Sequence, residues 1–349
     1  MRRRRKLWII LLATPLILVA ADAFYWRMTE RSLEDGFAAW LGERRAAGWT
    51  ATTQPPVRGG WPLAATLTVP GIELKGGDPE IPGGVAWGAD RVTLRVSLLR
   101  PGVLDVAAGG MQHIRFADNP EVPYTADRLR VVLPLQPDAA PQAMDVTVQN
   151  LRAGMPAGKD ATAGLTVGLL QLHADIRQPE QSADPALAFS LHADAINPPP
   201  GVARLLGPRI GSFSMEGVLD GAVPRAATLA DRAAAWRDGG GSLEIRRFAL
   251  NWGPLDLTAS ATLSLDEQLQ PMGAGSARAV GYAETLDALA AHSAISRSAA
   301  TAAKAVLSLL AHSPDDGGPP DVEVPLTLQY RTLSMRQVPL VRLPELDWP

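Results

Sequence analysis

The chain has 349 residues, of which 46% are hydrophobic, enough to bury a substantial core and too many for extensive disorder. Its 33 basic and 36 acidic residues nearly balance, which gives no indication of a nucleic-acid-binding surface. The absence of cysteine excludes disulfides, thiolate nucleophiles, zinc–thiolate sites and iron–sulfur clusters. The 32 glycines and 30 prolines are typical of many strands joined by tight turns.

The first 26 residues predict a signal anchor. Residues 2–6 are all basic, and an apolar run follows from 7 to 21. A basic flank before about 20 apolar residues is typical of a membrane span whose basic end stays in the cytoplasm. Three aromatic residues come next and are expected at the opposite membrane interface: Phe24, Tyr25 and Trp26. A cleaved signal peptide is the alternative, because residues 21–23 form a small-x-small site.

Residues 27–48 predict an amphipathic helix that leaves the membrane and docks on the rest of the chain. Leu33, Phe37 and Leu41 recur at helical spacing, and Gly48 is expected to end the helix. The remainder, 49–349, is then an extracytoplasmic β-rich domain.

Strict alternation of apolar and polar residues dominates that domain in three segments, 91–98, 255–265 and 322–330. Such alternation predicts half-buried strands of an antiparallel sheet with one wet and one apolar side. The inward residues are the candidate lining of an apolar groove: Val92, Leu94, Val96, Leu257, Leu263, Leu265, Val324, Leu326 and Leu328.

Shorter strand candidates lie at 64–69, 72–75, 129–133, 144–149, 165–176, 187–193 and 243–252, the last with a bulge at Arg246 and Arg247 where the apolar phase changes. Residues 226–237 predict a helix, and 282–311 predict one long or two shorter helices that cover part of the apolar face.

The fold class expected is α+β and mainly β: a long curved antiparallel sheet with a few covering helices and an N-terminal transmembrane helix. Trp-Gly dipeptides at 87 and 252 precede two of the strands, so two similar halves, about 49–200 and 201–349, are an alternative to one undivided domain.

The sequence offers no motif for catalysis, cofactor binding or metal binding. The segment 211–217 is not a nucleophile elbow and is interpreted as a turn entering a strand, and the glycines at 273 and 275 lack the frame of a dinucleotide loop. The five histidines are scattered and indicate surface or strand positions. Arginines on strand faces suit either anionic headgroups and glycans or plain solvation: Arg91, Arg95, Arg100, Arg128 and Arg130.

Several short segments resemble a known bacterial family. They are Gly59 to Pro62, Gly84 to Trp87 leading to 98–101, Ala261 to Asp266, and Val338 to Pro344. Together they resemble the family called domain of unknown function 2125. The resemblance implies an envelope protein of Gram-negative, alphaproteobacterial type with no assigned activity, so it supplies no functional residues. More distantly, an anchor with long alternating strands is similar to AsmA-like envelope proteins, whose sheets curl into grooves that hold lipid.

The expected function is that of a non-enzymatic inner-membrane protein with a periplasmic C-terminal domain, whose groove binds lipid acyl chains. Its expected partners are the membrane, lipid and other envelope proteins, without nucleic acid or a cofactor. One alternative is a scaffolding envelope protein with a closed core that docks a protein partner. A hydrolase acting on envelope polymers is a third hypothesis, which requires acids and serines distant in sequence to converge.

Overall fold

The computed structural model describes residues 2–77, 84–136, 141–154, 164–177, 184–222, 228–312, 319–335 and 338–348, and for residues 2–16 and 18 it describes the backbone alone. Within these residues the chain forms one 17-stranded sheet and five helices. The helices are α1 (Arg2–Ala46), α2 (Pro200–Leu206), α3 (Leu229–Asp238), α4 (Tyr282–Ala291) and α5 (Arg297–Leu310). The strands are β1 (Thr50–Thr52), β2 (Val57–Gly59), β3 (Ala64–Gly76), β4 (Val85–Ser97), β5 (Arg100–Phe116), β6 (Val122–Thr125), β7 (Arg128–Pro134), β8 (Ala143–Ala153), β9 (Leu165–Ile176), β10 (Pro185–Asn197), β11 (Ile210–Asp220), β12 (Ser242–Trp252), β13 (Leu255–Leu265), β14 (Pro271–Val280), β15 (Asp321–Gln329), β16 (Thr332–Met335) and β17 (Val338–Arg342).

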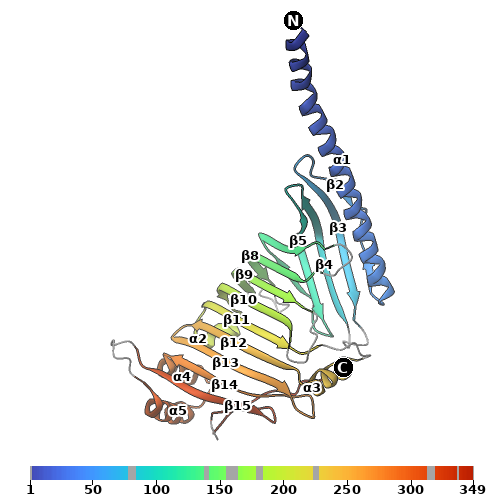
Figure 1. Ribbon diagram of the computed structural model, residues 1–349. Coiled ribbons are helices and arrows are strands. Elements are labelled where there is room, and N and C mark those ends of the chain that lie inside the picture. Colours follow the sequence, from blue (N-terminus) through green and yellow to red (C-terminus); the bar gives the residue numbers. More distant parts are fainter. Residues whose placement is uncertain are drawn as a thin grey trace.

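The sheet is an antiparallel meander in which strands pair largely in chain order. β3, β4 and β5 pair in sequence, β5 and β8 are bridged by both β6 and β7, and β8 to β17 again pair in sequence. β1 and β2 both pair with β3 at the N-terminal edge. Figure 1 shows the result as a long twisted band with β3 near one end and β15 near the other. The sheet is continuous through residue 200, because β10 pairs with both β9 and β11.

The alternating segments form strands as predicted. The strand predicted at 255–265 is β13, and the phase change in β12 is a bulge, with a register shift between Ile245 and Phe248. This bulge keeps both Ile245 and Phe248 on the apolar side although they are three positions apart. The turn predicted at 211–217 is wrong, because these residues lie inside β11. Glycine or serine at positions 211, 212, 214 and 217 imitates the composition of a turn.

A single helix, α1, joins the predicted anchor to the predicted amphipathic helix. Its C-terminal part lies along β3, and its N-terminal part projects beyond the sheet (Figure 1). Its last residue is Ala46, and Gly48, which was predicted to end it, follows two residues later with a φ of 83° that suits glycine and an amide that donates to the Arg45 carbonyl. Within the described part of the chain, no helix combines the length and apolar character that a membrane span requires. Most of the apolar run at 7–21 lies outside the residues whose side chains are described.

The remaining helices lie at strand ends. α2 connects β10 to β11, and the region predicted as one or two helices is two, α4 and α5, which connect β14 to β15. α3 connects β11 to β12 at the opposite ends of the strands, and residues 226 and 227 of its predicted range lie outside the described residues. Thr228 caps α3 by accepting from the Asp231 amide, and Ser296 caps α5 by accepting from the Ala299 amide.

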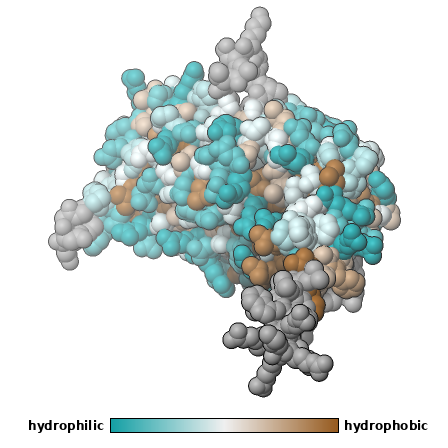
Figure 2. Space-filling view, turned by 90° about the horizontal axis from the view of Figure 1, so that it is seen from above, coloured by the Kyte–Doolittle hydropathy of each residue, from teal (hydrophilic) through white to brown (hydrophobic). Residues whose placement is uncertain are grey.

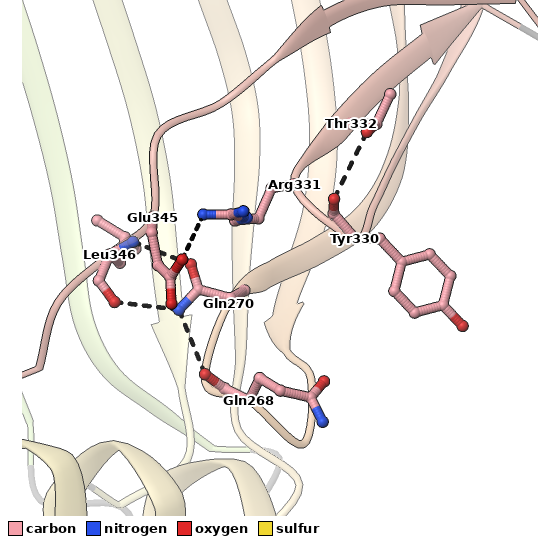
Figure 3. Close-up of polar contacts among 7 residues, drawn as sticks. All are labelled: Gln268, Gln270, Tyr330, Arg331, Thr332, Glu345 and Leu346. Carbon is pink, nitrogen blue, oxygen red and sulfur yellow. Dashed lines mark hydrogen bonds and ion pairs between the residues drawn. The ribbon is translucent and has the colours of Figure 1, made fainter.

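The C-terminal segment after β17 folds back across the end of the sheet. Gln270, buried beside the turn before β14, donates from Nε2 to the Leu346 carbonyl at 3.0 Å and accepts from the Leu346 amide at 2.9 Å (Figure 3). Its Nε2 also donates to the Gln268 carbonyl at 3.2 Å. Arg331 and Glu345 add an ion pair of 2.6 Å, so the segment ties the β13–β14 turn to the β15–β16 turn.

Candidate functional site

One face of the sheet carries continuous rows of directly paired apolar residues. Directly paired residues of antiparallel strands project to the same face, so each row can be followed through the register. The first row is Leu67, Leu94, Val106, Val131, Val146, Leu172, Leu191, Met215, Phe248, Ala259, Ala277 and Val324. The second row is Val69, Val92, Ala108, Leu129, Val148, Leu170, Ala193, Phe213, Leu250, Leu257, Ala279 and Val322. We call the surface formed by these two rows and their neighbours on the same side the apolar face.

The apolar face is closed where α1 covers it, whereas farther along the sheet most of its large side chains are half-buried and only a few, such as Val148 and Val322, are buried. Leu67 and Val69 are completely buried, and they form a core cluster against which Leu33 and Phe37 of α1 pack. Farther along the first row, every side chain larger than alanine is only half-buried: Val106, Val131, Val146, Leu172, Leu191, Met215, Phe248 and Val324. Large apolar side chains in a closed core would be buried as Leu67 is, so this part of the face remains accessible to water.

The other helices reach the apolar face near strand ends. Trp252 continues its apolar side at the end of β12, and its indole Nε1 donates to the Gly207 carbonyl at 2.9 Å. The C-terminal end of α2 therefore lies over the end of β12. The helices make their main sheet contacts with β1, β3, β13 and β15, which leaves the strands between β5 and β12 without an equivalent cover from the described helices.

The predicted groove residues all lie on this face but in two separate places. Val92 and Val96, which are 5% and 2% exposed, and Leu94 lie in the part closed by α1. The others lie at the far end, on β13 and β15: Leu257, Leu263, Leu265, Val324, Leu326 and Leu328. Of these, Leu328 is buried and the others are half-buried.

The residues that connect these two places were not among the predicted groove residues. The missed residues lie on β5 and β7 to β12, where Phe213 and Phe248 meet edge to face with ring centroids 5.5 Å apart. A period-two signal was present in β9 and β10, whereas Ala107 to Gly110 dilute it in β5. Single-strand alternation identifies an inward residue, but only the register shows that successive strands align their inward residues.

The opposite face is hydrophilic and carries exposed ion pairs. A row that alternates with the apolar ones includes Arg130, Thr147, Gln171 and His192. On the same face His173 Nδ1 lies 2.7 Å from an Asp145 carboxylate oxygen, and hydrogen bonding to that carboxylate raises the pKa of His173 above its ordinary value. The two faces therefore differ sharply in chemistry, and only one of them suits an apolar ligand.

The predicted interface aromatics separate into two groups. Phe24 and Tyr25 are 74% and 39% exposed on α1. Trp26 instead donates from Nε1 to the Ala64 carbonyl at 3.1 Å, which fixes α1 to the beginning of β3. Their place at a membrane interface stays a prediction.

The histidines lie at strand or surface positions, as predicted. His113, His173 and His192 are strand residues, each within 3.1 Å of a carboxylate oxygen: Glu73, Asp145 and Asp194, respectively. Among the described residues no group of three or more histidine, aspartate or glutamate side chains could hold a metal ion.

The family model described as "Uncharacterized protein conserved in bacteria (DUF2125)" matches residues 26–344. The chain belongs to this family. The match begins at Trp26, where α1 meets the sheet, and ends just beyond β17, so it spans the whole described sheet. Comparison with curated proteins and with solved structures finds no match. The more distant likeness to AsmA-like envelope proteins is not among the findings and stays an expectation.

Proposed function

We propose that this family member is a membrane-anchored, non-enzymatic protein of the bacterial envelope whose apolar face binds the acyl chains of lipids. One observation carries the proposal: the paired apolar rows cross the sheet without interruption, yet beyond α1 most of their large side chains are only half-buried, Val148 and Val322 being the buried exceptions. An apolar surface of this size that is left open to water is unfavourable in a soluble domain and is typical of a binding surface.

The dimensions of the face suit acyl chains. The part of the rows without equivalent helix cover runs from β5 to β12, which at about 4.8 Å between neighbouring strands gives a path of roughly 30 Å. The acyl chains of one bilayer leaflet span about 15 Å, half of a hydrocarbon core of about 30 Å. The open part of the face is therefore about two acyl chains long, which suits lipids that lie along it in succession.

The anchor in this proposal is the N-terminal part of α1. The basic residues 2–6 and the apolar run 7–21 are continuous with the helix that packs on β3. A basic flank on the cytoplasmic side would place the sheet in the periplasm, held at the inner membrane. Together these features support a protein that holds its apolar face beside the bilayer.

Lipid binding can be tested on the full-length chain. After purification in detergent and transfer to detergent-free nanodiscs, crosslinking with a photoactivatable fatty acid should label peptides from β8 to β12. Leu172→Arg places a charge in the middle of the apolar face and should reduce labelling severalfold, because a desolvated guanidinium is unfavourable beside acyl chains.

Gln171→Arg is the matched control, since Gln171 is the exposed neighbour of Leu172 on the hydrophilic face. Its labelling should equal that of the unmodified chain. If neither variant changes the labelling, or if no labelling occurs on the apolar face, the proposal is wrong.

A scaffolding function is a second candidate, favoured by the C-terminal edge of the sheet. All five residues of β17 are exposed, and this edge strand can accept a strand from a partner protein. A photocrosslinking residue at Leu340, which is 51% exposed, should then capture one defined envelope protein in cells. Such capture together with a lipid-free apolar face would favour the scaffold.

A further inference from the structure

Two turns at one end of the sheet lie together beside the point where α1 meets it. Residues 60–63 connect β2 to β3, and residues 98 and 99 connect β4 to β5. The Leu98 amide donates to the Leu63 carbonyl at 3.2 Å, which joins the two turns. Trp26 of α1 bonds to Ala64, the next residue along the chain. The turns thus lie at the end of the sheet beyond which α1 projects (Figure 1).

The tips of these turns are apolar and exposed. Leu99 is 88% exposed, Leu63 70% and Trp61 53%. Solvated turns are normally built from glycine, proline and short polar residues, so two leucines and a tryptophan at adjacent tips are unusual. Figure 2, seen from above, shows a surface that is mainly hydrophilic, with hydrophobic residues scattered over it. Exposed apolar side chains grouped as at these turn tips mark a contact surface.

A cationic hollow lies directly behind the Leu99 turn, on the hydrophilic face. Arg95, Arg100 and Arg130 line it together with Asp105, Ser97 and Val103. The single carboxylate of the hollow pairs with Arg130. Asp105 is also the direct cross-strand partner of Arg95, and three guanidinium groups against this one carboxylate leave the hollow with a net positive charge that an anion can neutralise. Guanidinium groups bind phosphate oxygens through paired hydrogen bonds.

The apolar turn tips and the cationic hollow behind them come in the same order as the layers of a bilayer, counted from its centre outward. The acyl region comes first and the phosphates second, and tryptophan favours the boundary between them. A protein partner would have to present an apolar pocket and an anionic group in the same order, whereas an anionic phospholipid bilayer presents both everywhere. Charge complementarity therefore favours the bilayer as the occupant.

We propose that this end of the sheet is a second membrane contact, in which Trp61, Leu63 and Leu99 enter the bilayer interface and Arg95 and Arg100 bind the phosphate of an anionic phospholipid. This inference rests on the proposed membrane anchor, and it adds a lipid-headgroup site that is separate from the apolar face. The contact holds the sheet against the membrane beside α1 and prevents it from swinging freely on the helix.

Because the chain has no cysteine, one introduced cysteine can carry an environment-sensitive dye at a single site. Leu99→Cys, labelled with nitrobenzoxadiazole in the full-length chain, is reconstituted in vesicles of phosphatidylglycerol and phosphatidylethanolamine. We expect blue-shifted emission and strong quenching by lipids with nitroxide-labelled acyl chains. Tyr330→Cys is the matched control: Tyr330 is 80% exposed in the β15–β16 turn at the far end of the sheet, and its dye should stay in water. Equal, weak quenching at both sites overturns the proposal.

The headgroup site is tested by the charge of the lipid. The Arg95→Gln and Arg100→Gln double variant should lower quenching at position 99 to the level seen in neutral phosphatidylcholine vesicles, whereas an Arg128→Gln and Arg247→Gln control pair should not. Quenching that is equal in anionic and neutral vesicles overturns the headgroup site. Loss of quenching on addition of millimolar inorganic phosphate assigns the hollow to a soluble anion and also overturns it.

The two proposals can fail separately. Leu172→Arg should abolish acyl-chain labelling of the apolar face but leave quenching at position 99 unchanged. Labelled acyl chains on β8 to β12 with a solvent-exposed dye at position 99 would refute the membrane contact alone. A buried dye at position 99 with no labelled face would refute the proposed function alone.

Discussion

Leu67 and Leu172 belong to the same row of the apolar face, but they should respond very differently to truncation to alanine. Leu67 is completely buried in the cluster packed against α1, whereas Leu172 is half-buried on β9, away from the strands that the described helices mainly contact. The two substitutions remove the same atoms from the same sheet. Any difference between the losses in free energy of unfolding therefore measures how well each part of the face is covered.

The expected magnitudes follow from burial. Leucine to alanine removes three carbons, which at about 0.8 kcal/mol per buried methylene is a transfer loss of about 2.4 kcal/mol. At Leu67 the cavity left beneath α1 adds to this loss, giving a destabilisation of about 3 to 4 kcal/mol. At Leu172 the side chain is partly hydrated already and leaves no enclosed cavity, so the loss should be about 1 kcal/mol.

Urea unfolding of the full-length chain in a fixed detergent, followed by tryptophan fluorescence, measures both losses from the shift in midpoint. Bound acyl chains should increase the loss in free energy of unfolding caused by the Leu172 truncation and leave the loss at Leu67 unchanged, because only Leu172 gains new apolar neighbours. Equal losses at the two sites in the absence of lipid would show that the face is closed along its length, and the reasoning for lipid binding would be refuted.

Two further predictions concern polar contacts. Hydrogen bonding to the Asp145 carboxylate raises the pKa of His173. The pair therefore contributes its full stabilisation below the ordinary histidine pKa of about 6.5, and this contribution is lost as pH rises through the raised pKa. In the Asp145→Asn variant, proton NMR should show a lower pKa for His173 than in the unmodified chain. Gln270→Ala should speed amide hydrogen exchange in residues 343–348 and lower the free energy of unfolding by about 2 kcal/mol, because it removes the side-chain hydrogen bonds to Leu346. Gln268→Ala should leave exchange unchanged, because Gln268 contributes only its backbone carbonyl to this contact.

Much of the sheet could be predicted from alternation alone. Strands β9 and β13, in which apolar residues recur mainly at alternate positions, were predicted with the bounds they have. The bulge in β12 was also predicted, because two adjacent arginines between apolar residues of opposite phase leave few other arrangements.

Strands rich in small residues were not predicted from the sequence. β5, β11 and β14 contain many glycines, alanines or serines on one or both faces, and such residues carry little period-two signal. Their neighbours hold them in the sheet through backbone pairing and the register of larger residues. Tertiary pairing thus decides their conformation where local preference does not.

The apolar character of the candidate site could be predicted from the sequence, but not that its residues form unbroken rows across the sheet. Alternation within a single strand correctly indicates an apolar side, as for Leu94 and Leu257. That the two residues belong to rows running unbroken from β3 to β15 depends on the register of every intervening pair, which no single segment encodes. The turn tips at Leu63 and Leu99 were missed for another reason: a lone leucine in a turn has no periodic signal, and it becomes informative only when a second one lies beside it.

The chain-order pairing of the strands has a consequence for how such a sheet can evolve and fold. Because nearly every strand pairs with the one before it, a hairpin inserted between two neighbouring strands replaces only the pair between them and leaves the other pairs unchanged. During synthesis the chain can likewise add strands in the order in which they emerge, since most contacts join segments that are close in sequence. The distance that such a protein covers is therefore adjustable by whole hairpins.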